Sequence, residues 1–240
     1  MTLDEVLDSL FPHGHHVTND DGVLTGTAPL QAGGDAIVIG IAGRTALGVD
    51  EAFRLSGFLL SSLQSGSGPI LVIVDSDSQR MAKRDELLGL NEYLAHLAKI
   101  LIHADLAGRP TIGLLYGHTA AGAFLATAMA TRILVALPGA EPVVMDLPSM
   151  SRVTKLPIEV LEEKAKSTPV FAPGLDNLAR TGAVHAVWNA DLPLADQLAA
   201  LLAALPGAED RRGTLGRERG GRPMAHDIAE RVHDLARHSL

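Results

Sequence analysis

The sequence contains no cysteine and few aromatic residues. Without thiols, the chain can form no disulfide, no thiolate metal site and no cysteine nucleophile. Phenylalanine, tryptophan and tyrosine together make up 3% of the residues, which disfavours the aromatic platforms on which single-stranded nucleic acids stack. The net charge is −8, and no dense basic patch precedes the C-terminal tail. A nucleic-acid partner is therefore not expected.

Membrane and secretion signals are also lacking. No basic, apolar and small-residue signal opens the chain, and no apolar run approaches the roughly 20 residues that a membrane helix needs. We therefore expect a cytoplasmic protein without a membrane partner. The 240 residues, of which 47% are hydrophobic, suffice to bury a substantial core in one large domain or two small ones.

Nucleotide-binding and metal-binding motifs are not evident. No Gly-x-Gly-x-x-Gly follows the first buried strand, and there is no Walker loop. His13, His15 and His16 lie close together in the sequence, but a metal site needs further ligands in a fixed geometry. We interpret the three histidines as part of a solvated loop and expect no metal.

What the sequence does contain is an alternation of apolar runs and helical periodicity. Residues 36–42, 70–74 and 111–116 are continuous apolar runs, typical of strands covered on both faces. Residues 49–62 and 86–107 place apolar side chains at helical spacing between those runs. Strands separated by helices favour parallel pairing with right-handed crossovers, so we predict an α/β fold.

Shorter elements complete the predicted organisation. Residues 80–85 are charged and predicted as a mobile loop, and 211–222 are rich in Arg and Gly and predicted as a linker. We divide the chain into a domain over 1–210, that linker, and a C-terminal helix over 223–240. Further helices are predicted at 2–11, 155–166, 174–180 and 192–205, and further strands within 17–28 and at 132–137, 143–145 and 182–188.

The stretch from Pro110 to Ala126 is the predicted chemical centre. A buried strand turns at Gly117 and passes through small residues at 119–123. We expect the chain to leave this turn as an apolar helix through Leu125, Met129 and Ile133. Such a turn points free backbone N–H groups at whatever lies beyond it, and small residues let a ligand approach the main chain.

This stretch supports several interpretations. Backbone N–H groups near Ser76 and within 117–123 could form an oxyanion site, or the small residues could only permit close helix–sheet packing. His118 could do acid–base work or bind a carboxylate, or it could cap local backbone. A serine hydrolase would use Ser76 or Ser78 with His118, although the Gly-x-Ser-x-Gly elbow is missing. The apolar helices could also simply dock a partner chain.

Taken together, the motifs resemble the carboxyltransferase branch of the crotonase superfamily. The resemblance lies in a strand that ends in Asp75-Ser76, an Arg-Pro-Thr-Ile entry to the next strand at 109–112, and the Gly-His-Thr-Ala-Ala-Gly-Ala run at 117–123. Residues 181–187 are similar to a later strand of that family. More closely, the chain is similar to γ subunits of biotin-independent malonate decarboxylases over about residues 3–205.

The resemblance implies a crotonase-like spiral of ββα units and a function shared with other chains. Such γ subunits pair with a homologous β subunit and convert malonyl-S-acyl carrier protein to acetyl-S-acyl carrier protein and CO2. Acyl transferase and acyl carrier protein subunits complete the complex. The resemblance implies no cofactor on this chain itself, because the CoA-derived prosthetic group belongs to the carrier subunit. Thr119-Ala120 replaces a Gly-Gly pair of the family, which agrees with a biotin-independent relative.

The implied decarboxylation indicates which residues would form the site. Decarboxylation leaves an enolate on the thioester oxygen, so an oxyanion hole is the main catalytic need. We expect Gly122 and Ala123 to supply backbone N–H groups, with Ser76 nearby and His118 contacting the carboxylate or CO2. The predicted substrate-binding residues around them are Asp75, Gly117, Thr119 and Ala121. The alternatives are a stand-alone acyl-CoA hydratase or hydrolase, for which Glu141 is the one nearby glutamate, and a non-catalytic partner subunit.

Overall fold

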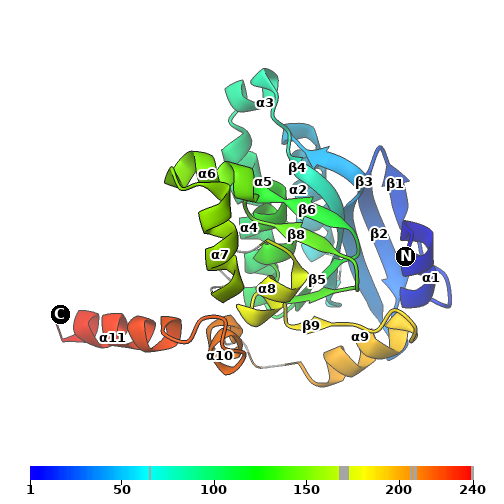
Figure 1. The fold of residues 1–240 in the computed structure, drawn as a ribbon. Helices are drawn as coiled ribbons and strands as arrows, with labels where there is room; N and C mark the ends of the chain where they lie inside the picture. The colour runs from blue at the N-terminus through cyan, green and yellow to red at the C-terminus, as the bar shows by residue number, and fades with distance from the viewer. Residues whose placement is uncertain (65, 168–172, 206, 208–209, 239–240) are drawn as a thin grey trace. The chain divides into compact units, whose positions relative to one another are not determined.

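The computed structural model describes all of the chain except residues 65, 168–172, 206, 208–209 and 239–240 (Figure 1). The chain divides into two compact units. The first unit comprises Met1–Val144 and Ala186–Ala208, and the second comprises Met145–His185 and Glu209–Leu240. Among the described residues, no helix combines the length and apolar character needed to cross a membrane.

In the first unit, seven of the described strands form one large sheet in the order β1-β2-β3-β4-β5-β7-β9. The first three strands pair antiparallel, and every pair from β3 to β9 is parallel. This arrangement confirms the predicted α/β class and the parallel pairing of the three central strands. The strands are β1 (Thr18–Asp20), β2 (Val23–Pro29), β3 (Asp35–Leu47), β4 (Ile70–Gln79), β5 (Thr111–Leu115), β7 (Ile133–Ala136) and β9 (Ala186–Val187).

Helices cover both faces of this sheet, as Figure 1 shows. Helices α1 (Leu3–Leu10) and α9 (Leu194–Ala203) pack on one face, where their apolar side chains join those of alternate strand residues in one buried cluster. Helices α2 (Val49–Leu63) and α4 (Leu90–Leu106) pack against each other and contact β3 and β5. Because both faces are covered, residues 70–74 of β4 and all of β5 are buried at every position rather than at alternate ones.

A second, smaller sheet follows the turn at Gly117. It pairs β6 (His118–Ala120) with β8 (Glu141–Val143) in parallel. The chain thus runs from β5 in the large sheet through β6 in the small sheet into α5 (Ala121–Ala126), and then repeats a two-strand step through β7 and β8. These ββα steps are the predicted crotonase-like pattern. The predicted extension of the helix as far as Ile133 is wrong, because α5 gives way to a 3₁₀ turn (Ala128–Ala130). Ile133 instead opens β7, which confirms the strand predicted at 132–137.

The charged segment after β4 is more structured than predicted. Residues 83–87 form helix α3 (Lys83–Leu87) where the sequence indicated a loop up to Asp85. The long helix predicted over 86–107 is divided, because Gly89 adopts a left-handed conformation with φ of 81° between α3 and α4. Glycine adopts this conformation without the penalty of a β-carbon, so the break occurs there.

The second unit contains the remaining helices. The helix predicted over 155–166 is α7, which begins only at Ile158, because Lys155 has φ of 61° and Pro157 follows it. Helix α6, which ends at Thr154, was not predicted. Residues 182–188 give only the two-residue strand β9 of the first unit. The helices of this unit are α6 (Leu147–Thr154), α7 (Ile158–Ser167), α8 (Leu175–Arg180), α10 (Arg212–Glu218) and α11 (Ala225–Arg237).

The Arg/Gly-rich segment predicted as a linker contains helix α10, which packs against the end of α8. Glycines make this contact possible, because a β-carbon at Gly216 would lie 2.4 Å from the carbonyl oxygen of Thr181. The guanidinium of Arg219 donates hydrogen bonds to the carbonyl oxygens of Ala179, Val184 and His185 at 2.7–2.8 Å. The sequence bias therefore reflects packing and carbonyl capping rather than a solvated connection.

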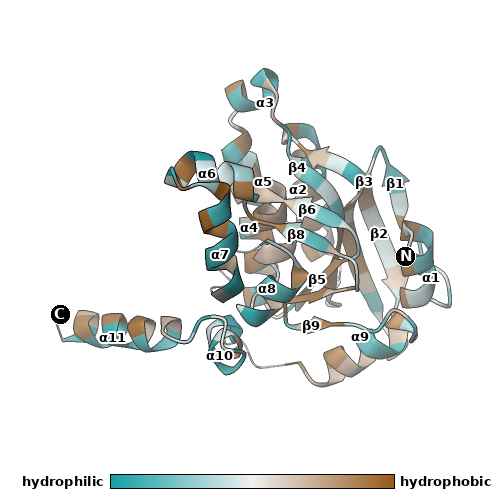
Figure 2. Ribbon diagram, in the orientation of Figure 1, coloured by the Kyte–Doolittle hydropathy of each residue, from teal (hydrophilic) through white to brown (hydrophobic). Residues whose placement is uncertain are grey.

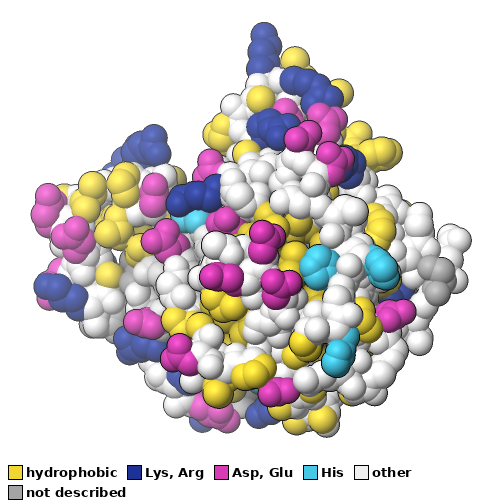
Figure 3. Space-filling view, turned by 90° about the vertical axis from the view of Figure 1, so that its right-hand side faces the viewer, with side chains coloured by type: hydrophobic (Ala, Val, Ile, Leu, Met, Phe, Trp, Pro, Cys, Tyr) yellow, Lys and Arg dark blue, Asp and Glu magenta, His cyan; other side chains and the backbone are white. Residues whose placement is uncertain are grey.

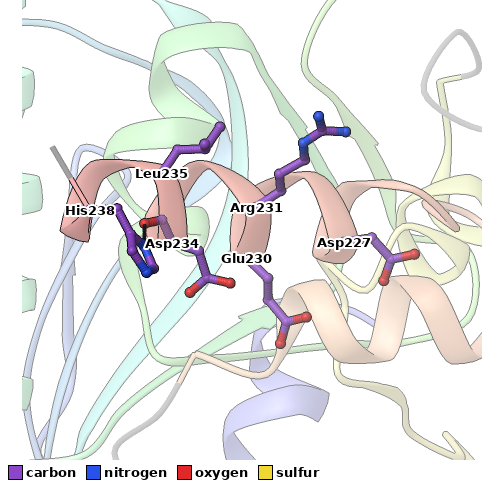
Figure 4. A pocket seen from close by; sticks show the side chains of 6 residues that line it. All are labelled: Asp227, Glu230, Arg231, Asp234, Leu235 and His238. Carbon is purple, nitrogen blue, oxygen red and sulfur yellow. Dashed lines mark hydrogen bonds between the residues drawn. The ribbon is translucent and has the colours of Figure 1, made fainter.

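Helix α11 is amphipathic and exposes both of its faces. In Figure 2 apolar and polar segments alternate along it, and Ile228, Val232 and Leu235 are all more than half exposed. Its polar side bounds an open hollow of about 470 Å³ (Figure 4), lined by Asp227, Glu230, Arg231, Asp234, Leu235 and His238. None of the site residues predicted from the sequence lines this hollow.

Candidate functional site

The site begins where β4 ends beside the turn from β5 to β6. One carboxylate oxygen of Asp75 accepts a hydrogen bond from the backbone N–H of His118 at 2.9 Å. Gly117 makes this close approach possible, since a β-carbon there would lie 2.3 Å from the same oxygen. Asp75 and Gly117 therefore shape the turn together, and a side chain at position 117 would displace the carboxylate.

Ser76 and Thr119 lie side by side beneath this turn. Their hydroxyl oxygens are 2.9 Å apart, and the two residues are 1% and 0% exposed. A nucleophile must reach substrate, so the buried Ser76 hydroxyl does not support the serine hydrolase interpretation. The Ser78 hydroxyl donates to the carbonyl oxygen of Gln79 and is likewise engaged locally. Thr119 is also no steric barrier above the site, because its side chain lies in the interior.

The turn from β6 into α5 brings the backbone N–H groups of the first helical turn close together. Ala121 has φ of 47°, a conformation that is uncommon for a residue with a β-carbon and that is concentrated at functional sites. Gly122 and Ala123 follow it in the first turn of α5, where N–H groups have no partner within the helix. Ala123 is fully buried, whereas Gly122 is partly accessible.

The N–H of Gly122 is not free in the structure. It donates to the side-chain carbonyl oxygen of Gln79 at 2.8 Å. A β-carbon at Gly122 would lie 3.0 Å from that oxygen, so the missing side chain permits the contact. Gln79 is not among the site residues predicted from the sequence. The only signal was its position at the C-terminal end of β4, where ligands of open α/β sheets bind.

The segment after Gln79 is anchored to the start of α2. Arg84 forms two hydrogen bonds with the carboxylate of Asp50, at 2.7 and 3.0 Å. Asp85 is 1% exposed and accepts from the backbone N–H of Val49 at 2.8 Å, which caps the helix. The hydrogen bond from Arg84 lowers the pKa of Asp50. Together with the Arg80–Glu51 ion pair of 2.7 Å, these contacts fix the end of β4 and hence Gln79.

His118 faces a carboxylate from the neighbouring strand. It lies opposite Glu141 in the register of β6 and β8, and its Nδ1 is 3.6 Å from a carboxylate oxygen of Glu141. This ring nitrogen is buried and makes no hydrogen bond to any residue in the described ranges, although the side chain as a whole is 18% exposed. Glu141 is 68% exposed, so its carboxylate can adjust towards the ring.

Tyr116 adds an uncharged polar group behind the turn. Burial and the charge of Asp75 raise its pKa above the ordinary value of 10. The N–H of Gly43, at the bulge in β3, hydrogen-bonds the phenol and opposes that shift. The tyrosine is therefore neutral beside Asp75 at physiological pH.

The structure thus gathers all eight predicted site residues in one part of the first unit. They lie in the second half of β4, just after β5, in β6 or at the start of α5: Asp75, Ser76, Gly117, His118, Thr119, Ala121, Gly122 and Ala123. Within the described ranges, no three His, Asp or Glu side chains are arranged to hold a metal ion. His15 instead accepts from the backbone N–H of Val17 at 3.2 Å, and Figure 3 shows the histidines on its face separated by other side chains.

Two sequence comparisons indicate relatives. Residues 42–236 match the sequence model of a family described as malonate decarboxylase gamma subunit. The chain is also 32% identical over 198 residues to the malonyl-S-ACP:biotin-protein carboxyltransferase MADD of Malonomonas rubra. That match covers 73% of this chain and 67% of the relative.

Solved structures share the fold over nearly the whole chain. A Pseudomonas malonate decarboxylase hetero-tetramer in complex with coenzyme A matches with a TM-score of 0.78 and 24% identity, covering 98% of both chains. A Pseudomonas malonate decarboxylase MdcD–MdcE hetero-dimer gives a TM-score of 0.75 and 24% identity over 99% of this chain and 97% of the other. Transcarboxylase 12S gives 0.68 at 16% identity, covering 84% of this chain and 39% of that one. These neighbours confirm the carboxyltransferase-like, crotonase-type fold.

Proposed function

Because this chain belongs to the malonate decarboxylase gamma subunit family, we propose that it forms, with a homologous β subunit, the site that decarboxylates malonyl-S-acyl carrier protein. The products are acetyl-S-acyl carrier protein and CO2. The stand-alone hydratase or hydrolase alternative receives no support from the relatives found.

The observation that carries the proposal is the Gly122 N–H at the turn from β6 into α5. Loss of CO2 leaves a negative charge shared between the α-carbon and the thioester oxygen, and a fixed N–H donor stabilises that charge more than the ground-state carbonyl. The Gln79 amide oxygen already accepts from this donor at 2.8 Å, and a thioester oxygen can take its place. Ala123 provides the next N–H of the same turn.

Other site residues have supporting roles in this proposal. Asp75 and Gly117 hold the turn through the 2.9 Å bond to the His118 N–H, and the Ser76–Thr119 pair fixes β6 to β4 from the interior. Ser76 therefore acts through Thr119 and not by touching substrate. The chain's own residues supply binding, the oxyanion donors and proton transfer, so this step calls for no cofactor on the chain.

The remaining components of the proposal follow from the family. We assign the CoA-derived prosthetic group to an acyl carrier protein subunit and the loading of malonyl groups to an acyl transferase subunit, all in the cytoplasm. The carrier-linked substrate is supported by the name of the Malonomonas relative, and the paired subunit by the Pseudomonas hetero-dimer.

A second candidate is carboxyl transfer to a biotin-bearing protein. The relative at 32% identity carries that activity in its name. In both reactions the malonyl thioester loses its carboxyl group through the same enolate, and the difference is whether CO2 leaves or is captured. The buried Thr119 side chain does not obstruct an acceptor, so the replaced Gly-Gly pair does not decide between the two.

The test is a reconstitution with carboxyl-labelled malonyl-S-acyl carrier protein. The chain alone, the β subunit alone and the two together are assayed for labelled CO2, with and without a biotinylated acceptor protein. We expect CO2 release from the mixture only, unchanged by the acceptor. Activity of the isolated chain would contradict the shared site, and label on the acceptor's biotin in place of released CO2 would favour the second candidate.

A further inference from the structure

We propose that His118 and Glu141 form a dyad in which His118 delivers the proton to the enolate carbon and Glu141 positions the imidazole. The inference rests on the proposed function and identifies the proton donor for that reaction.

The register of the small sheet places the two side chains together. β6 and β8 pair in parallel with His118 directly opposite Glu141, and the two residues lie on the same face of that sheet. The ring Nδ1 is 3.6 Å from the Glu141 carboxylate oxygen. Because the backbone N–H of His118 is held by Asp75 at 2.9 Å, the start of β6 is fixed from a second side.

The hydrogen bonding of the His118 imidazole supports its pairing with Glu141. Among the residues that the structure describes, the buried Nδ1 has no hydrogen-bond partner, which is unusual for a buried polar atom. The Glu141 carboxylate, which is largely exposed, needs to move less than 1 Å to accept a hydrogen bond from Nδ1–H at ordinary length. A carboxylate on Nδ1 fixes the tautomer and orientation of an imidazole, and leaves Nε2 for the substrate.

Charged groups near the dyad are few. Among the elements that pack against β6, β4 contributes Asp75 and Asp77, β8 contributes Glu141, and α5 has no titratable side chain. No Lys or Arg side chain lies on these three elements, so the charged groups that they bring to β6 are all carboxylates.

The proposed step balances. The bond between the α-carbon and the carboxylate breaks, its electron pair passes to the α-carbon and thioester oxygen, and CO2 leaves. The enolate electron pair then takes the Nε2 proton of the His118 imidazolium, forming the third C–H bond of the acetyl group. The neutral imidazole regains its Nε2 proton from water. Throughout the step, Nδ1 keeps its proton and donates a hydrogen bond to the exposed Glu141 carboxylate.

The test uses the assembled complex and runs the proton transfer in isolation. Acetyl-S-acyl carrier protein is incubated in D2O, and deuterium entry at the α-carbon is followed by mass spectrometry beside CO2 release from the malonyl form. General acid–base groups contribute roughly 10²–10⁴-fold, so we expect His118→Gln to slow exchange about 100-fold or more. We expect Glu141→Gln to slow exchange and kcat about 10-fold with KM unchanged, and Glu141→Asp to recover part of the loss.

Two controls make the result specific. Glu92→Gln removes an exposed carboxylate on α4 and should leave both rates unchanged. In the His118→Gln background, Glu141→Gln should cost less than 2-fold, because residues acting as a unit are not additive. A Glu141→Gln exchange rate equal to that of Glu92→Gln, or a full 10-fold loss in the His118→Gln background, would overturn the dyad. Absence of CO2 release by the wild-type complex would instead refute the proposed function.

Discussion

The side-chain carbonyl of Gln79 accepts a hydrogen bond from the backbone N–H of Gly122 at 2.8 Å. This hydrogen bond joins Gln79, the last residue of β4, to the first turn of α5. Its donor, the Gly122 N–H, is the group that we propose to stabilise the enolate oxygen. An amide oxygen resembles a thioester oxygen in charge and size. The free chain thus keeps its donor satisfied by an internal acceptor, which substrate must replace.

The first prediction concerns this competition. Gln79→Glu places a charged acceptor of the same shape on Gly122, and hydrogen bonds to charged groups are about twice as strong as neutral ones. We expect kcat/KM for malonyl-S-acyl carrier protein to fall about 10-fold. Gln79→Leu offers no acceptor and should stay within about 3-fold of wild type. Steady-state kinetics of the assembled complex measure both, and equal losses in the two variants would contradict the competition.

The second prediction concerns Gly117. A β-carbon there would lie 2.3–2.8 Å from Asp75, so Gly117→Ala forces the carboxylate away from the His118 N–H. Overpacking typically costs 1–3 kcal/mol, and we expect a loss of about that size in the free energy of unfolding. Gly57→Ala in helix α2 is the control, because a β-carbon at position 57 would meet no neighbouring atom of the described residues within 4 Å. It should stabilise by about 0.5–1 kcal/mol in the same urea titration.

The third prediction concerns alkaline pH. Burial and the Asp75 charge raise the pKa of Tyr116 in the folded state, whereas the unfolded chain has the ordinary value near 10. Stability is therefore fully present below pH 10 and is lost as pH rises towards the folded pKa. Tyr116→Phe should flatten this decline in urea titrations between pH 9 and 11. A decline of unchanged slope in the variant would argue that other groups cause it.

The fourth prediction concerns the second unit. Arg219 donates to three carbonyl oxygens that its planar guanidinium reaches at once, and lysine cannot reproduce this fork. Arg219→Lys should therefore increase amide hydrogen exchange in α8 and α10 by about 10-fold, with β4 and β5 unaffected. Arg217→Lys, whose guanidinium pairs with Asp227 at 3.2 Å on an exposed surface, should have little effect.

The sequence predicted the core of the fold because that information is local. Buried strands such as 70–74 and 111–116 are continuous apolar runs, and the helices between them carry a clear apolar stripe. Boundaries failed where a single backbone conformation decides, as at Gly89 and Lys155, whose positive φ ends one helix before the next begins. The Arg/Gly-rich segment misled because glycine allows close packing as readily as flexibility.

The sequence predicted which segment contains the site, but not the hydrogen bonds that connect its residues. Small residues after a strand marked 117–123, whereas the partner of Gly122 lies 43 residues earlier in Gln79. Likewise, the contact of Ser76 with Thr119 depends on how the small sheet packs against β4, which no local pattern encodes. Glu141 was noticed only as a nearby glutamate, and its place opposite His118 became visible with the register of β6 and β8.

The central claim is that the Gly122 N–H stabilises the enolate, and one comparison tests it most directly. Gly122→Pro and Gly122→Ala both add a β-carbon next to Gln79, but only proline removes the N–H. In complexes shown to assemble normally, kcat for CO2 release from malonyl-S-acyl carrier protein is measured for each. Losing one oxyanion donor costs roughly 10²–10³-fold, so we predict that the proline variant is slower than the alanine variant by about that factor. Equal rates in the two variants would contradict the account.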